Sequence, residues 1–319
     1  MTKVCDKLLH GIHFSQEQIR ACCMTFKGAV FAQNPVGDCF SDIIVARNLV
    51  LKNLEDGIVP TACKGCYELK EGDFDGDTKI SVVHLNHYLQ CNSLCAHCNN
   101  VDYPRQFSET PQKSGFYEVM PYLKKLDENG MFSDFVNVFF TGGEPTCLSE
   151  MPEILDFFGS KNSFIVLFSS GILFSEKIAN LMSHNKLRLV ISLDCGDSKT
   201  FKKIKRVDKF NQVLENIKKY ANFNSKQDDT YSCINLKYVI LKGFNDSEEE
   251  IDKFLEVAKL CGVTDVQPDF NNSPKIFGEK LPEKEISLMN SFVQKASALG
   301  FRCEVTSRVE NCVKKRLYI

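Results

Sequence analysis

The segment ISVVHLNHYLQCNSLCAHC, residues 80–98, joins a run of β-branched and aromatic residues to three cysteines. The run predicts a β-strand at 80–89. Cys91, Cys95 and Cys98 follow it at the carboxyl end of a strand, where the active sites of α/β sheets and barrels lie. A structural zinc site or an ordinary iron–sulfur cluster takes four protein ligands, so three cysteines leave one metal coordination position open. The alternative is that the three cysteines form one buried helical face.

Strand-like and helical segments alternate through the rest of the chain. Near-continuous apolar runs predict five further strands, at residues 135–141, 163–169, 187–194, 234–241 and 263–270. Helical spacing predicts helices after Gly115, over 149–158, after the N-caps Ser175, Asp208 and Asp246, and over about 282–299 before a final edge strand. Such alternation forms right-handed βαβ units, which build either an open sheet or a partial barrel.

The polar segment at 70–79 marks the best boundary before the alternating core. Residues 1–69 show no clean period and carry six cysteines. We therefore expect a small Cys-rich, metal-dependent module at 1–78, because such a segment cannot build a large core alone. The core is expected at 79–272, and a C-terminal helix with its edge strand at 273–319.

The composition narrows the class of protein. The chain has 319 residues, a formal net charge of −2 and 15 cysteines. This charge argues against a general nucleic-acid or membrane binder. No apolar run is long enough to cross a bilayer, and the first residues, MTKVCDKLLHGIHF, lack a signal-peptide core, so a cytoplasmic protein is expected. In such a protein, metal-binding or catalytic roles explain clustered cysteines better than disulfides do.

A second motif, FFTGGEPTCL, ends the next predicted strand. Gly142 and Gly143 let a backbone approach a ligand closely, and Pro145 fixes the turn. A plain loop between a strand and a helix is the alternative. CxxxCxxC after the first strand, with GGEP after the second, resembles the radical S-adenosylmethionine (radical SAM) superfamily over about residues 80–270.

The resemblance implies an α/β fold with a partial (β/α)6 TIM-type barrel. It implies that Cys91, Cys95 and Cys98 hold a [4Fe–4S] cluster whose remaining iron binds S-adenosylmethionine. Reductive cleavage of S-adenosylmethionine then gives a 5′-deoxyadenosyl radical, which abstracts hydrogen from a substrate. The substrate would be a peptide, a sugar or another small molecule, with epimerisation or dehydrogenation as outcomes. The electron donor would be a flavodoxin- or ferredoxin-type protein.

The resemblance also assigns cofactor contacts. His97 stands where the family usually has an aromatic residue near the adenine, and an imidazole can still stack there. The turn that contacts the methionine amino group corresponds to Gly142, Gly143, Glu144 and Pro145. Polar residues in or after later strands are expected to bind the ribose or the methionine end: Ser170, Ser192, Asp194 and Lys237. The alternative for each is a satisfied polar residue at a strand end.

The N-terminal cysteines predict a second metal site. Cys63 and Cys66 form a CxxC pair that suits one edge of a cluster or zinc site. The other two ligands are expected to be Cys5 and one of Cys22 or Cys23, with Cys39 in reserve. By ligand type this resembles the SPASM auxiliary-cluster modules of radical SAM enzymes, although those follow the barrel and have other spacings. We expect a [4Fe–4S] cluster here, with a structural zinc as the alternative.

Cys195 follows Asp194 at the end of the fourth core strand. A partly exposed thiol there could return a hydrogen atom to a substrate radical, and the alternative is a small structural loop residue.

Two other classes of function compete with the main hypothesis. One is a non-catalytic iron–sulfur or zinc protein for electron transfer or binding, against which GGEP argues. The other is an RNA-modifying radical SAM enzyme, for which no basic domain is present.

Overall fold

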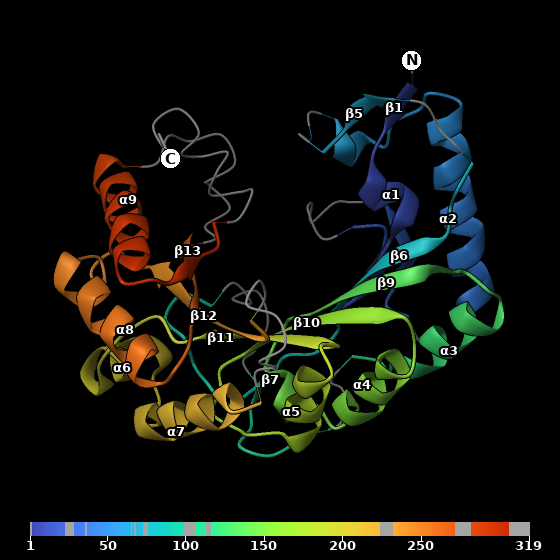
Figure 1. Cartoon of the computed structure of the whole chain (residues 1–319). Coiled ribbons are helices and arrows are strands. Elements are labelled where there is room, and N and C mark those ends of the chain that lie inside the picture. Colours follow the sequence, from blue (N-terminus) through green and yellow to red (C-terminus); the bar gives the residue numbers. More distant parts are fainter. Residues whose placement is uncertain are drawn as a thin grey trace. The chain divides into compact units, whose positions relative to one another are not determined.

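The structure is a computed structural model of the chain (Figure 1). It describes residues 2–22, 29–35, 37–64, 66, 68–72, 76–98, 106–112, 116–223, 232–271 and 282–305. Cys23, one of the predicted ligands, lies outside the described residues. The chain divides into two compact units, one of Met1–Gln90 with Thr110–Leu167, the other of Cys91–Glu109 with Phe168–Ile319.

The first unit is built on a sheet that mixes parallel and antiparallel strands. Its strands, in spatial order, are β10 (Ser163–Ser169), β9 (Phe132–Phe140), β6 (Ile80–Asn86), β2 (Gly11–Ser15), β3 (Gln18–Arg20) and β4 (Val30–Gln33). The pairs from β10 to β2 are parallel, and β3 and β4 add as antiparallel strands. Three of the predicted core strands are therefore confirmed within one or a few residues.

Two helices of the first unit match the predicted pattern. They are α3 (Met120–Glu128) and α4 (Met151–Gly159). Pro121 falls in the first turn of α3, where its missing N–H has no helical partner to lose. The buried faces of both helices carry the apolar residues that the sequence spaced three and four apart.

The N-terminal part of this unit has more regular structure than the sequence indicates. It contains β1 (Thr2–Val4), α1 (Asp6–His10), α2 (Phe40–Glu55), the 3-10 helix η1 (Thr61–Cys63) and β5 (Lys70–Gly72), which pairs with β1. The spacing of apolar residues does not predict helix α2, because Val45 and Leu49 are exposed while Arg47 is buried. The Arg47 guanidinium donates to Leu9 O at 2.7 Å and to Thr78 O at 2.5 Å.

Strand β2 ties the N-terminal residues to the core sheet. Gly11–Ser15 pair in parallel with Val82–Asn86 of β6. The compact units consequently have other boundaries than the predicted segments 1–78, 79–272 and 273–319. Sequence pattern does not predict this pairing, because a five-residue strand with two polar side chains shows little periodicity.

The second unit continues with parallel strands and covering helices. Its strands lie in the order β14 (Arg302–Cys303), β13 (Asp265–Phe270), β12 (Ile234–Ile240) and β11 (Leu187–Ser192). Its helices are α5 (Glu176–Ser183), α6 (Ser198–Lys205), α7 (Phe210–Ala221), α8 (Glu248–Leu260) and α9 (Glu283–Ala298). A short separate pair joins β7 (Gln90–Cys91) to β8 (Gln106–Phe107).

Three predicted helix caps can be compared with the structure. Ser175 caps α5 as predicted, since its hydroxyl accepts a hydrogen bond from Ile178 N. The predicted caps Asp208 and Asp246 are wrong by one residue. Helix α7 has Lys209 as its N-cap, and α8 has Ser247, whose hydroxyl accepts from Glu250 N. Helix boundaries commonly shift by this amount.

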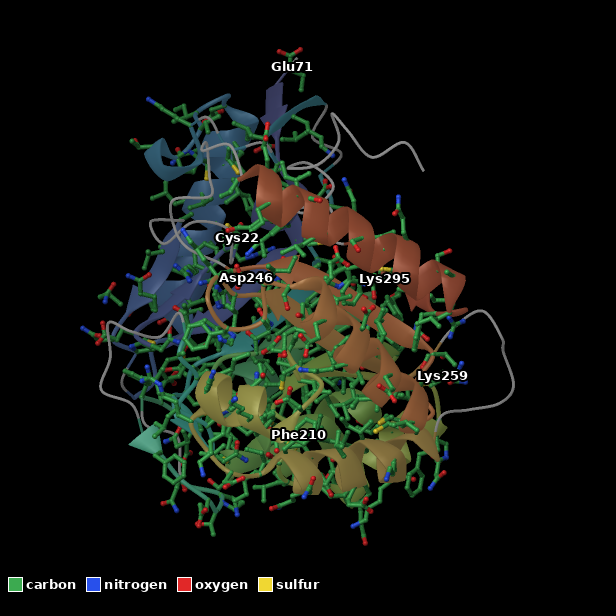
Figure 2. The ribbon with its side chains drawn as sticks, turned by 90° about the vertical axis from the view of Figure 1, so that its left-hand side faces the viewer. Cys22, Glu71, Phe210, Asp246, Lys259 and Lys295 are labelled. Atoms are coloured by element: carbon green, nitrogen blue, oxygen red, sulfur yellow. The ribbon has the colours of Figure 1, made fainter. Side chains whose placement is uncertain are left out.

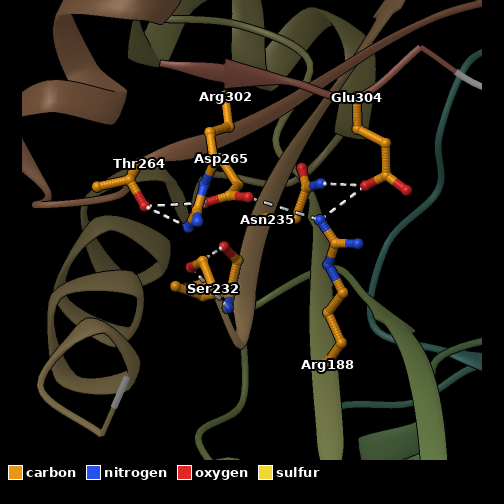
Figure 3. A network of polar contacts seen from close by, with 8 residues as sticks. Arg188, Ser232, Asn235, Thr264, Asp265, Arg302 and Glu304 are labelled. Carbon is orange, nitrogen blue, oxygen red and sulfur yellow. Dashed lines mark hydrogen bonds and ion pairs between the residues drawn. The ribbon is translucent and has the colours of Figure 1, made fainter. Parts of the chain in front are cut away.

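A charged network closes the amino ends of the strands in the second unit (Figure 3). Asp265, at the start of β13, accepts from Arg302 Nη2 at 2.7 Å and Nε at 3.2 Å. Arg188, in β11, pairs with Glu304 at 2.7 Å. The amino ends of barrel strands are the face where residues serve stability, so this network is structural. No helix among the described residues is both long and apolar enough to cross a bilayer.

Candidate functional site

The three-cysteine segment forms an irregular loop. Cys91 ends β7, and residues 92–98 contain no helix, so the alternative of one buried helical face is wrong. Cys91, Cys95 and Cys98 form no disulfide, and all three are half-buried. Burial raises the pKa of the Cys95 thiol, and the positive charge of Lys205 opposes that rise. A buried thiolate of this kind needs a cation or a metal beside it.

Polar atoms inside the loop have no hydrogen-bond partner among the described residues. They are Asn92 Nδ2, Ser93 Oγ and His97 Nδ1, each on a side chain that is largely buried. Buried polar atoms of native proteins nearly always have partners. Three cysteines on one loop with such atoms fit a cluster that also carries a polar ligand.

Among the described residues, no three His, Cys, Asp or Glu side chains converge closely enough to hold one metal ion. A cubane cluster makes a different demand, because each thiolate binds a different iron atom and the sulfur atoms need not meet at one point.

The Gly142-Gly143 turn lies in the first unit and fits tightly against β6 and the residues that follow it. Gly142 has φ +111°, and a Cβ atom there would lie 2.5 Å from Asn86 Oδ1. A Cβ on Gly143 would clash with Gln90 O. Only glycine fits either position, which explains both residues by backbone geometry as well as by any ligand.

Glu144 caps its own turn. Its backbone N–H donates to Gln90 O at 2.7 Å, and its carboxylate accepts from Thr146 N at 3.2 Å and from Thr146 Oγ1 at 2.7 Å. The side chain is 1% exposed, and Pro145 begins the 3-10 helix η2 (Pro145–Cys147) that this cap starts. Contact of this turn with the methionine amino group stays a prediction.

Ser170 and Ser192 lie at the strand ends where the sequence places them. The Ser170 hydroxyl donates to Asn92 Oδ1 at 2.9 Å and so links the third core strand to the cysteine loop. Ser192 is the last residue of β11 and is half-buried. Asn92 was not foreseen as part of the site, although its place next to Cys91 is a signal.

Asp194 differs from its predicted surroundings. It is fully buried, and its carboxylate pairs with Lys205 Nζ at 2.5 Å and accepts from Val239 N at 2.8 Å. The carboxylate therefore has two partners inside the protein, and the expected contact with the cofactor stays a prediction. His97 Nε2 lies 3.8 Å from the same carboxylate, and burial lowers the pKa of His97.

Lys205 is the site residue that sequence reasoning missed. It lies in a lysine-rich run that reads as a solvated helix face. Its burial could have been inferred from its position four residues after Phe201 and next to Ile204, on the apolar face of α6. Lys237, which is predicted to contact the cofactor, pairs with Asp269 at 2.8 Å, as a charged residue inside an apolar strand requires.

Cys195 is fully buried, with its sulfur 3.5 Å from Leu193 O. Burial raises the pKa of its thiol far above the ordinary range. A hydrogen donor needs access to the substrate, so the structure supports the structural alternative for this residue.

Four N-terminal cysteines line one small cavity in the first unit: Cys5, Cys22, Cys63 and Cys66. Figure 2 shows Cys22 in this part of the chain. Cys5 is the N-cap of α1, and Cys63 ends η1, so separate elements bring the thiols together. Burial raises the pKa of Cys63 to about 11, and the other three thiols add to the rise. The reserve ligand Cys39 lies elsewhere, 3.3 Å from the Tyr122 hydroxyl.

Part of the chain is similar in sequence to known proteins. The model of the Radical SAM superfamily matches residues 85–255. GTP 3′,8-cyclase of Clostridium botulinum (strain Okra / Type B1) is 27% identical over 185 residues, which are 57% of this chain and 53% of that protein. Probable GTP 3′,8-cyclase of Saccharolobus islandicus is 27% identical over 193 residues, 60% and 55% of the two chains. The chain thus spans about half the length of the curated relatives it matches.

Solved structures share the fold. SuiB of Streptococcus suis bound to S-adenosylmethionine has a TM-score of 0.53 at 12% identity, over 86% of this chain and 64% of that one. SuiB bound to its precursor peptide SuiA has a TM-score of 0.55 at 13% identity, over 91% and 60%. Together with the parallel strands, these likenesses confirm the predicted α/β fold of the partial TIM-barrel type. Since the family model covers more than half of its residues, the chain belongs to the radical SAM superfamily, whose [4Fe–4S] cluster and S-adenosylmethionine are its cofactors.

Proposed function

We propose that this chain is an enzyme that reductively cleaves S-adenosylmethionine and abstracts a hydrogen atom from a substrate. The three-cysteine loop carries the proposal, because it combines three half-buried cysteines that form no disulfide with three buried polar atoms that lack partners among the described residues. Cys91, Cys95 and Cys98 would hold the cluster. When bound, the cluster and its cosubstrate supply the 5′-deoxyadenosyl radical.

The residues of the chain would hold and orient these groups. Asn92, fixed by Ser170, would present its amide to the cosubstrate, and His97 would stack near the adenine. The Gly142-Gly143 turn would let a backbone come close to the methionine end. Lys237 has three donors, so it can bind Asp269 and a cosubstrate carboxylate together.

The test is anaerobic reconstitution, followed by dithionite and S-adenosylmethionine. We expect 5′-deoxyadenosine from the wild type and none from Cys95→Ala. Cys303→Ala is the matched control, because this half-buried cysteine of β14 takes no part in the proposed site. A wild type that loads a reducible cluster yet forms no 5′-deoxyadenosine would instead be a non-catalytic electron-transfer or binding protein.

The substrate is proposed to be a peptide, a sugar or another small molecule, and the electron donor a flavodoxin- or ferredoxin-type protein. GTP is the first small molecule to test, since similar proteins carry the name GTP 3′,8-cyclase. A peptide is the next, since one structural neighbour was solved with its precursor peptide. Transfer of deuterium from a labelled candidate into 5′-deoxyadenosine identifies the substrate.

The four-cysteine cavity is proposed to hold a second [4Fe–4S] cluster. Cys5, Cys22 and Cys63 are each less than a tenth exposed, and all four thiols line the same space. Four soft ligands in one buried place are the donor set of a complete cluster. Zinc, the alternative, takes the same ligands, but the sulfur atoms would have to draw closer together, because no three such side chains among the described residues converge on one metal ion. The Lys7–Glu68 ion pair, at 2.6 Å, lines the same cavity.

A further inference from the structure

A buried ion pair lies behind the cysteine loop. Lys205 is 2% exposed and Asp194 is not exposed at all, and their charged groups are 2.5 Å apart. Asp194 is itself fixed, because its carboxylate accepts from Val239 N and its backbone carbonyl accepts from Asn245 Nδ2 at 2.7 Å. Removing two charges from water is costly, so such a pair is weak evidence for stability and calls for another explanation.

The same helix end holds the loop by its backbone. Leu94 N donates to Lys205 O at 2.9 Å, and Ala96 N donates to Ile204 O at 2.8 Å. These two residues flank Cys95 on either side. The carbonyls can accept from the loop because α6 ends there, at the left-handed residue Arg206 with φ +58°. The position of Cys95 is therefore set by the last turn of α6.

The ion pair also meets the loop directly, because His97 Nε2 lies 3.8 Å from the Asp194 carboxylate that holds the Lys205 ammonium. The buried positive charge therefore lies beside the stretch of loop between Cys95 and Cys98. In a buried place the effective dielectric constant is low, so a fixed positive charge has a large effect on a nearby negative group.

We propose that Lys205, held by Asp194, is a positioning residue that fixes Cys95 and raises the reduction potential of the cluster bound there. The inference rests on the proposed function. Reduction adds one electron from the donor and so adds negative charge to the cluster. A buried cation beside one of its thiolates stabilises the reduced form, since net charge and surroundings set cluster potentials.

The experiment is an anaerobic redox titration of Lys205→Met, Lys205→Arg and Lys202→Met holoproteins. The signal to follow is the one that S-adenosylmethionine perturbs, because only a cluster with an open iron binds it. We expect a lower potential in Lys205→Met and a potential near the wild-type value in Lys205→Arg. Lys202→Met is the matched control, since Lys202 lies on the same helix but is exposed and pairs with Asp208 at the surface.

Each outcome decides for or against the inference. A wild-type potential in Lys205→Met overturns it, and so does loss of the cluster in both Lys205→Met and Lys205→Arg, because shape would then matter instead of charge. Loss of the cluster in Lys205→Met alone supports it. Iron content separates the two proposals: if Cys95→Ala keeps all its iron, the proposed function fails, whatever the potentials are.

Discussion

Lys237 Nζ lies 2.8 Å from Asp269 Oδ2, so the charged residue inside β12 is held by the neighbouring strand β13. Its side chain keeps two further donors for a ligand. We predict that Lys237→Met weakens binding of S-adenosylmethionine by about tenfold or more, the value of one charge-assisted hydrogen bond. Calorimetric titration of the cluster-loaded protein measures this. Unchanged affinity with a full iron content would show that the pair is only structural.

Replacing Cys91, Cys95 and Cys98 together by Ala should abolish formation of 5′-deoxyadenosine. The iron content should fall by about four atoms per chain, the content of one cubane cluster. Chromatography and iron analysis check both results. A triple variant that still cleaves S-adenosylmethionine would falsify the assignment of this loop.

The four-cysteine cavity predicts that this triple variant retains iron and sulfide with a paramagnetic signal of its own. Adding Cys63→Ala should remove that signal, whereas adding Cys39→Ala should not, because Cys39 lies against Tyr122. Metal analysis decides between the metals, and zinc in place of iron would end the cluster proposal. Since metal binding is coupled to folding, Cys63→Ala is also expected to lower solubility.

Cys195→Ser should leave S-adenosylmethionine cleavage and product formation unchanged. The cost should appear in stability, at about 1–3 kcal/mol, because a hydroxyl takes the place of a fully buried thiol. Denaturant unfolding of the wild type, Cys195→Ser and Cys195→Ala measures this loss in the free energy of unfolding. Normal cleavage without final product would restore the hydrogen-donor role.

His84 predicts a loss of stability in mild acid. Burial lowers its pKa to about 4, and its ring stacks on Phe139 at 4.8 Å. Below pH 6.5 the unfolded chain binds a proton at this residue while the folded chain does not, so the free energy of unfolding falls as the pH falls towards 4. Between pH 7 and pH 5 the loss should be about 2 kcal/mol.

The measurement is urea unfolding of the wild type and His84→Phe at both pH values. The phenylalanine keeps a ring against Phe139 and cannot titrate, so the variant should lose about 2 kcal/mol less than the wild type. His13 is present in both proteins, and its lowered pKa comes first from burial and from Arg20, with the charge of His84 a smaller cause. Equal losses would show that His84 does not titrate in this range.

Local pattern was enough for the core strands and for the cysteine loop. A strand such as β10 is an apolar run bounded by polar residues, and its length is fixed by local sequence. The three cysteines predict a cluster site because few other kinds of site have this CxxxCxxC spacing. Cys5, Cys22, Cys63 and Cys66 line one cavity, although their number alone could not place them together, and their role as ligands stays a prediction.

Long-range pairing was beyond the sequence. Nothing in the run around Lys205 shows that its ammonium meets Asp194, because the two charges come from a strand end and a helix end eleven residues apart. The sequence consequently predicts a contact of Asp194 with the cofactor and does not predict its ion pair with Lys205. Arg47 is a similar case, since its partners Leu9 and Thr78 are backbone carbonyls from distant segments.

The pairing of β2 with β6 has a consequence for any shortened form of the protein. A chain that began at Lys79 would present β6 with a bare row of N–H and C=O groups, the kind of template on which strands of other molecules add. We expect such a fragment to self-associate in light scattering even if its barrel helices form. Lysine or proline substitutions along the exposed edge of β6 should reduce this association, because such residues block the addition of a further strand.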